Sequence, residues 1–228
     1  MHWGHLRSAE EIREMFDLEQ VIFIPTNVSP HKKSTEIVSA NHRLKMLDLA
    51  VKRNPCFFTS DVELKRPGKS YSIETVSCFK QAFEEELNLF FIMGMDAFLE
   101  INSWKNYNKL FSLCNFIVMT RPRYATKGLD QVIPAQMMKD FVYHPDEMRF
   151  AHHSQFSIYF KEITSLDISS NAIRTFIRNG RSVKYLLPEE VERYVKEHRF
   201  YVTLNLQMQI FFLNDLVNNR NDTGHLMR

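Results

Sequence analysis

The sequence has little cysteine, glycine and proline, and each shortage excludes a class of protein. The three cysteines in 228 residues, Cys56, Cys78 and Cys114, are odd in number and lie far apart. They form neither a disulfide framework nor a paired-thiolate zinc site, so they predict a reducing compartment, the cytoplasm. Six glycines and eight prolines are too few for a collagen-like or linker-rich architecture.

The chain also lacks a charge excess and a long apolar run. Its 29 Lys and Arg nearly balance 27 Asp and Glu, which gives no support for bulk nucleic-acid or membrane binding. Asn88 and Asp96 interrupt the longest apolar stretch, 87–99, before it reaches the roughly 18 residues of a membrane span, and no signal-peptide core opens the chain. A hydrophobic content of 44% is enough for a packed core. We expect one domain, 1–201, and an extension of unknown role, 202–228.

Helical and strand-like patterns alternate along most of the chain. Apolar residues spaced three and four apart predict helices at 6–16, 39–53, 170–178 and 188–198. A further helix is predicted to begin at Ser70 or Ser72, with Ile73, Val76 and Phe83 pointing inward. β-Branched and aromatic runs predict strands at 21–24, 57–64, 89–93, 116–119 and 156–163. The continuous run 89–93 is typical of a strand buried on both faces, and residues 123–155 are less regular. The alternation predicts an α/β fold, a Rossmann-like, doubly wound parallel sheet with C-terminal helices.

A first group of polar residues stands immediately before the first expected helix. His2 and His5 bracket Gly4, which lets the backbone approach a ligand closely. Imidazole donors and the free N–H groups of a helix start suit an anion, above all a phosphate whose charge grows in a transition state. Taken alone, the motif is explained better by two incidental histidines or by half a metal site.

A second group lies in the segment 167–174. Ser169 or Ser170 can cap the helix that follows, and Arg174, one turn further, reaches the same side as Ser170. Taken alone, these residues are explained as well by structure as by phosphate binding, because helix capping accounts for the serines and a surface ion pair accounts for the arginine. The two groups lie near opposite ends of an α/β sequence, and parallel sheets bring such helix N-termini to one edge, where ligands bind.

With both motifs, the sequence resembles the HxGH nucleotidyltransferases, and in detail the bacterial nicotinate-nucleotide adenylyltransferases. The supporting segments run in order from His2 to about Tyr201 and comprise 25–32 (similar to PNxxPPHK), 67–75 (similar to PSYTxDT), 91–96, Trp104, 120–122, 185–188 and 194–195. The departures are Asn171 for the threonine of ISSTxIR, Glu74 for an aspartate and Arg123 for a glycine.

The resemblance implies transfer of the adenylyl group of ATP to nicotinate mononucleotide, with Mg²⁺ on the triphosphate, release of pyrophosphate and no covalent enzyme intermediate. It implies catalytic roles for His2, His5 and Arg174. It implies ATP contacts at Gly4, Gly94, Asp96, Arg121, Ser169, Ser170 and Ile173, and mononucleotide contacts at Asn27, His31, Lys32, Ser72 and Trp104. Core packing competes as an explanation of Trp104, and a solvated basic loop competes for His31 and Lys32. The resemblance implies no metal ligand among the side chains and assigns no oligomeric state.

Two other functions stay open: another HxGH enzyme, acting on phosphopantetheine or a cytidylyl acceptor, and a truncated, non-catalytic nucleotide-binding protein. Trp104 and the 30–32 loop favour nicotinate mononucleotide over the other acceptors. A zinc site of His2 and His5 with His31, His152 or His153 ranks last, because no cysteine pair supports it. The family has a first strand and a glycine-rich loop upstream of the position of His2. We therefore expect the sheet to lack its first strand, and an upstream extension to restore activity.

Overall fold

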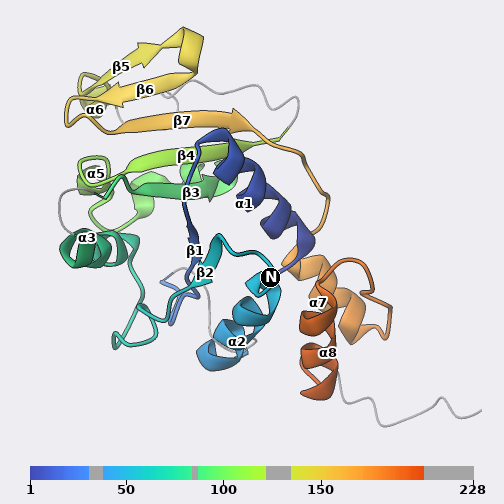
Figure 1. Ribbon diagram of the computed structural model, residues 1–228. Helices are drawn as coiled ribbons and strands as arrows, with labels where there is room; N and C mark the ends of the chain where they lie inside the picture. The colour runs from blue at the N-terminus through green and yellow to red at the C-terminus, as the bar shows by residue number, and fades with distance from the viewer. Residues whose placement is uncertain (31–37, 84–86, 122–134, 203–228) are drawn as a thin grey trace, which may run out of the picture.

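The strands form two sheets whose parallel members are connected through helices (Figure 1). The computed structural model describes residues 1–30, 38–83, 87–121 and 135–202. β1 (Val21–Phe23) and β2 (Phe57–Thr59) pair in parallel. The second sheet has the order β3-β4-β7-β6-β5. In it β3 (Phe90–Gly94), β4 (Asn115–Thr120) and β7 (Ser157–Glu162) are parallel, and β6 (Arg149–His152) and β5 (Phe141–His144) are antiparallel.

Helices precede, connect and follow these strands. They are α1 (Trp3–Met15), α2 (Ala40–Val51), α3 (Ser72–Phe83), α4 (Met95–Leu99), α5 (Tyr107–Leu110), α6 (Ala135–Met138), α7 (Ser170–Arg178) and α8 (Glu189–Glu197), with 3₁₀ turns η2 (Ile101–Ser103) and η4 (Pro145–Glu147). α1 buries Leu6, Ala9 and Ile12, which lie three residues apart and so share one face. The predicted α/β class is confirmed, although the β5–β6 hairpin makes the larger sheet mixed rather than wholly parallel.

The main core surrounds β4, the strand between β3 and β7. Phe116, Ile117 and Val118 are fully buried, because β3 and β7 flank this strand and residues of α3, α4 and α5 share a core cluster with Phe116 and Val118. The prediction of full burial for 89–93 is wrong, since β3 lies at the edge of its sheet and only Met93 is buried. The inward placement of Phe83 is also wrong, because its side chain is 57% exposed at the end of α3.

The two sheets lie next to each other and share apolar contacts. Ile92 of β3 packs against a cluster that contains Leu6, Val21, Val51 and Phe57. Among the described strands, β1 pairs only with β2, and β3 pairs only with β4. The expectation that a further strand belongs to this fold stays a prediction.

Other segments differ from the patterns in the sequence. The strand predicted at 57–64 ends at Thr59, and the carbonyl of Asp61 then accepts bonds from Leu64 and Lys65 in a turn. The irregular stretch 123–155 holds the β5–β6 hairpin, in which the neighbouring Val142 and Tyr143 are both exposed, so β5 does not alternate between buried and exposed residues. The expected extension 202–228 lies outside the described residues, except for its first. In the part of the chain that the structure describes, no helix has the length and apolarity needed to cross a bilayer.

Candidate active site

The histidines of the first motif stack on each other at the start of α1. His2 is the N-cap residue, and its carbonyl accepts the first helical bonds from the N–H groups of His5 (3.0 Å) and Leu6 (3.3 Å). Residues three apart on a helix are neighbours on its surface. The two imidazoles accordingly stack with ring centroids 3.7 Å apart and an interplanar angle of 26°.

Gly4 is required by the position of the His2 ring. A Cβ atom at Gly4 would lie 3.1 Å from His2 Nδ1, 3.2 Å from His2 Cε1 and 3.6 Å from the Leu166 carbonyl oxygen. A side chain there would push the ring away from its present position. The glycine between the histidines therefore has a local steric reason, and its contact with ATP stays a prediction.

Burial keeps both histidines neutral at pH 7. His2 is 5% exposed, and burial, followed by the charge of His5 and the amino terminus, lowers its pKa to about 3. Burial and then the charged amino terminus lower the pKa of His5 to about 4. His2 Nδ1 is buried and has no hydrogen-bond partner in the described structure. An unpaired buried polar atom is costly, so an incoming ligand that bonds to it is stabilised by the pairing.

These lowered pKa values predict loss of stability in acid. A group whose pKa is lower in the folded state stabilises the fold fully above its unfolded value of 6.5, and this contribution disappears as the pH falls towards the folded values of about 3 and 4. We expect the free energy of unfolding to drop more steeply below pH 6.5 in the parent chain than in a His2→Asn/His5→Asn variant. Urea unfolding at a series of pH values measures this, and equal slopes would contradict it.

The second motif lies beside the first, at the start of α7. Figure 1 shows the N-terminal end of the chain next to α7. The Trp3 N–H donates to the Leu186 carbonyl (3.2 Å), and the Thr164 N–H donates to the Glu11 carboxylate (3.0 Å). The Met1 amino group has a lowered pKa because of burial and, second, the positive charge of Arg174. The start of α1 therefore lies near Arg174 of α7, and a shared ATP site at this place stays a prediction.

Within this motif the side chains have different surroundings. Ser169 caps α7 by accepting a bond from the Ala172 N–H (3.1 Å), as predicted. Arg174 donates to the Asn171 side-chain oxygen and lies 5.9 Å from the ring centroid of Tyr201. Ile173 packs in a core cluster and is 5% exposed. Its side chain therefore anchors α7 to the core, and the expected ATP contact of Ile173 stays a prediction.

The predicted ATP-contact residues on the sheet follow neighbouring strands. Gly94 ends β3 and caps α4, and a Cβ there would meet nothing within 4 Å. Asp96 in the first turn of α4 and Arg121 just after β4 are both exposed. Because Gly94 is in register with Met119, these residues stand at one edge of the sheet. Their contact with ATP stays a prediction.

Two of the residues predicted to contact the mononucleotide, Asn27 and Trp104, also make contacts within the protein. Asn27 Nδ2 donates to the Arg66 carbonyl (3.1 Å), and the Asn27 N–H donates to Ser70 Oγ (3.0 Å), so Asn27 ties its loop to the segment before α3. Trp104 is half-buried and meets Phe91 edge-on, with ring centroids 5.9 Å apart, so core packing occupies part of its ring. Ser72 opens α3. His31 and Lys32 lie outside the described residues.

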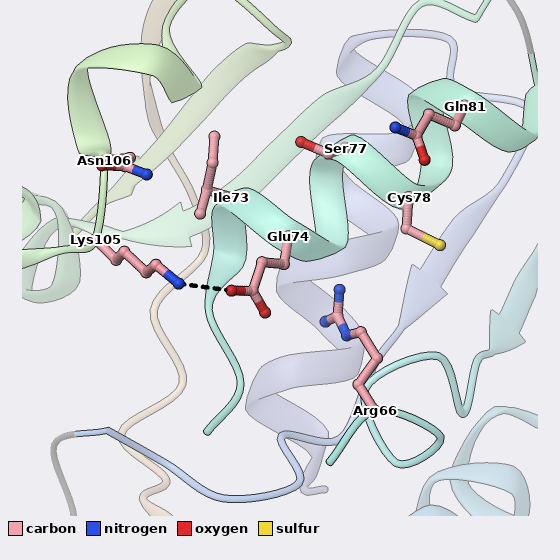
Figure 2. A pocket seen from close by; sticks show the side chains of 8 residues that line it. All are labelled: Arg66, Ile73, Glu74, Ser77, Cys78, Gln81, Lys105 and Asn106. Atoms are coloured by element: carbon pink, nitrogen blue, oxygen red, sulfur yellow. Dashed lines mark hydrogen bonds and ion pairs between the residues drawn. The ribbon is translucent and has the colours of Figure 1, made fainter. Parts of the chain in front are cut away.

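A hollow of about 540 Å³ adjoins α3 and was not expected from the sequence (Figure 2). Lys105 Nζ donates to Glu74 Oε1 at 2.8 Å, and Figure 2 shows this pair with Arg66 across from it. Arg66 also donates to Thr75 Oγ1, which donates to the buried Glu63 carboxylate (2.8 Å). The motif patterns carried no signal for Arg66, because its neighbours come from two separate stretches of chain.

Known proteins are similar to this chain over most of its length. The cytidylyltransferase-like family model matches residues 1–176. A probable nicotinate-nucleotide adenylyltransferase of Geotalea uraniireducens is 46% identical over 201 residues, which cover 88% of this chain and 93% of the relative. The similarly named protein of Geobacter sulfurreducens is 43% identical with the same coverage.

A solved structure shares the fold. Plasmodium falciparum nicotinic acid mononucleotide adenylyltransferase, complexed with NaAD, has a TM-score of 0.64 and 17% identity, and the match covers 88% of this chain and 91% of that chain. At such low identity this likeness concerns the fold alone, whereas the bacterial relatives establish the kinship. From the paired helix N-termini and these similarities together, we conclude that the chain belongs to the nicotinate-nucleotide adenylyltransferases of the cytidylyltransferase-like family.

Proposed function

We propose that this chain joins ATP to nicotinate mononucleotide, forming nicotinate adenine dinucleotide and releasing pyrophosphate, at the junction of the α1 and α7 N-termini. The observation that carries the assignment of the site is the stacked, neutral pair His2 and His5, next to a Met1 amino group that the charge of Arg174 reaches. Two helix N-termini, two imidazoles and one guanidinium are groups that bind the oxygens of a polyphosphate. The reaction belongs to one domain, residues 1–201.

The reaction needs positioning and charge neutralisation. The mononucleotide phosphate attacks the α-phosphorus of ATP in line, and pyrophosphate leaves as the new bond forms. Ring N–H groups of His2 and His5 donate to phosphate oxygens whose charge grows on the way to the transition state. Arg174 holds the triphosphate through its guanidinium. Ser169 accepts the α7 capping bond, and its hydroxyl proton is free to be donated to a phosphate oxygen.

The residues at this junction suit a metal carried by the nucleotide rather than one caged by the protein. Mg²⁺ prefers oxygen ligands and is commonly bound through substrate phosphates. The proposed ATP contacts offer histidine, arginine and serine side chains, with the exposed Asp96 as their single carboxylate. Mg²⁺ would therefore be held by the triphosphate, where it supplies neutralisation of the phosphate charge.

The ligands of the solved relative agree with this proposal. The Plasmodium falciparum structures are complexes with NaAD and with APC. On the acceptor side we propose Trp104 and Ser72 for the nicotinate ring and its carboxylate, and Asn27, His31 and Lys32 for the rest of the mononucleotide. The three cysteines are free thiols, which fits our proposal of a cytoplasmic enzyme.

The acceptor assignment is tested by comparing the nicotinate and nicotinamide mononucleotides. Stacking tolerates either ring substituent, so polar groups such as the Ser72 hydroxyl must discriminate. We expect pyrophosphate release with ATP to favour the acid, and Ser72→Ala to lower that preference by about 10-fold, the value of one hydrogen bond to a charged group. Ser77→Ala, on the same helix, is the control. Equal rates with both mononucleotides, or a preference for the amide, would overturn the nicotinate assignment.

A further inference from the structure

Asp140, His152 and His153, three potential metal ligands, lie together in the larger sheet. They are at the end of that sheet away from the proposed active site. Asp140 precedes β5, and His152 and His153 stand at the end of β6, where Ala151 pairs with Ser157 at the start of β7. One donor atom of each residue lies within 4.8 Å of the donor atoms of the other two. They line a separate hollow of about 250 Å³.

The hairpin geometry brings the three residues together. Phe141 pairs with His152 across the β5–β6 ladder, and one step beyond it the His153 N–H donates to the Asp140 carbonyl (3.0 Å). His153 Nδ1 is 3.9 Å from Asp140 Oδ1, and the two imidazoles have centroids 4.1 Å apart. Backbone pairing thus holds these donors close.

The ring of His152 is oriented by a chain of hydrogen bonds. Ser154 Oγ donates its single proton to the Phe111 carbonyl (3.1 Å), so at 2.6 Å from His152 Nδ1 it accepts the ring N–H. We assign the ring proton to Nδ1 from this shorter contact, although the Ser154 N–H, which also lies 3.3 Å from Nδ1, would need a lone pair there. His152 Nε2 then carries the free lone pair. A hydrogen bond of this kind on the other ring nitrogen is the usual support for a metal-binding histidine.

We propose that Asp140, His152 and His153 bind a divalent transition-metal ion of the zinc class, with water completing its coordination. Two imidazoles and one carboxylate suit Zn²⁺, whereas Mg²⁺ prefers oxygen ligands alone. Zinc bonds of this kind place tetrahedral donors about 3.3 Å apart. His153 is exposed and the Asp140 carboxylate is only half-buried, so both are able to close the present separation.

The charges around the hollow are compatible with such an ion. Lys109 is the one cation that faces it among the described residues, and the Asp140 carboxylate offsets that charge. A bound ion would tie the start of β5 to the end of β6, because Asp140 directly precedes β5 and His152 and His153 stand at the end of β6.

The test uses Zn²⁺ and the spectroscopic probe Co²⁺ on the full, metal-free chain. We expect one ion per chain by calorimetry, visible Co²⁺ bands, and a Zn²⁺-dependent rise in the melting temperature. Asp140→Asn and His153→Ala should each weaken Zn²⁺ binding at least about 10-fold, and Ser154→Ala about 10- to 100-fold through the lost orientation of His152. His144→Ala, at the far end of β5, is the matched control and should bind as the parent does.

Three outcomes would overturn the site. The first is that the parent chain does not bind Zn²⁺. The second is that Asp140→Asn and His153→Ala both bind Zn²⁺ with the affinity of the parent. The third is that a His2→Ala/His5→Ala variant loses the ion instead. Melting of each variant without metal establishes that it is folded, so weakened binding is not mistaken for unfolding. Adenylyl transfer is not used as a readout, and the result is independent of the proposed function.

Discussion

Replacement of His5 by alanine is expected to lower the turnover rate of dinucleotide formation by about 10²–10³-fold, the loss seen when one preorganised donor to a developing anion is removed. His5 stacks on His2 at the start of α1, and burial holds its pKa near 4, so the ring acts at pH 7 as a neutral donor. Because the interaction strengthens in the transition state, kcat and kcat/KM should fall together. Steady-state measurement of pyrophosphate release provides both parameters.

Two further variants separate this role from a structural one. His5→Asn keeps an N–H donor of similar reach and should recover part of the rate, whereas a role in packing alone would make the two variants alike. His198→Ala, at an exposed histidine after α8, should leave the rate unchanged. A His5→Ala chain that melts like the parent and keeps its turnover within a few-fold would remove His5 from the mechanism.

Replacement of Arg174 by alanine is expected to lower kcat/KM for ATP by about 100-fold. Arg174 is half-buried one turn into α7, and its charge faces the Met1 amino group at the start of α1. Loss of charge-assisted hydrogen bonds to phosphate costs about 1.5–3 kcal/mol, which corresponds to roughly 10- to 150-fold. Stability should not fall, because the variant removes a cation that stands near another cation.

Arg174→Lys tests whether geometry or charge matters. Lysine restores the charge without the planar fork, so we expect it to recover only part of the lost activity. The exposed Arg193, on α8, provides a matched arginine-to-alanine control. If Arg174→Ala binds and uses ATP as the parent chain does, α7 does not supply the triphosphate site and the junction of the two helices is the wrong location.

Much of this fold was predictable because it depends on local backbone geometry. The helix at Ser170–Arg178 has the predicted bounds, since Ser169 supplies a capping oxygen and the apolar residues follow the helical period. The nucleotidyltransferase family was predicted from ordered motifs and is confirmed by relatives of 43–46% identity. That the start of α1 lies near α7 was predictable because parallel sheets collect helix N-termini at one edge, while the grouping of His2 and His5 with Arg174 around ATP stays a prediction.

The remaining features depend on which segments become neighbours, and a local pattern does not carry that information. The run 89–93 reads as a buried strand, yet its place at a sheet edge leaves it half-buried. Asp140 meets His152 and His153 only through the hairpin, and Ile173 is directed to the core by the packing of α7.

The sequence by itself determined the helix and strand periods, the cap of α7 and the residue types able to bind phosphate. The tertiary structure alone decided edge positions, burial and hence the lowered pKa values of His2 and His5, because desolvation arises only when distant segments pack together.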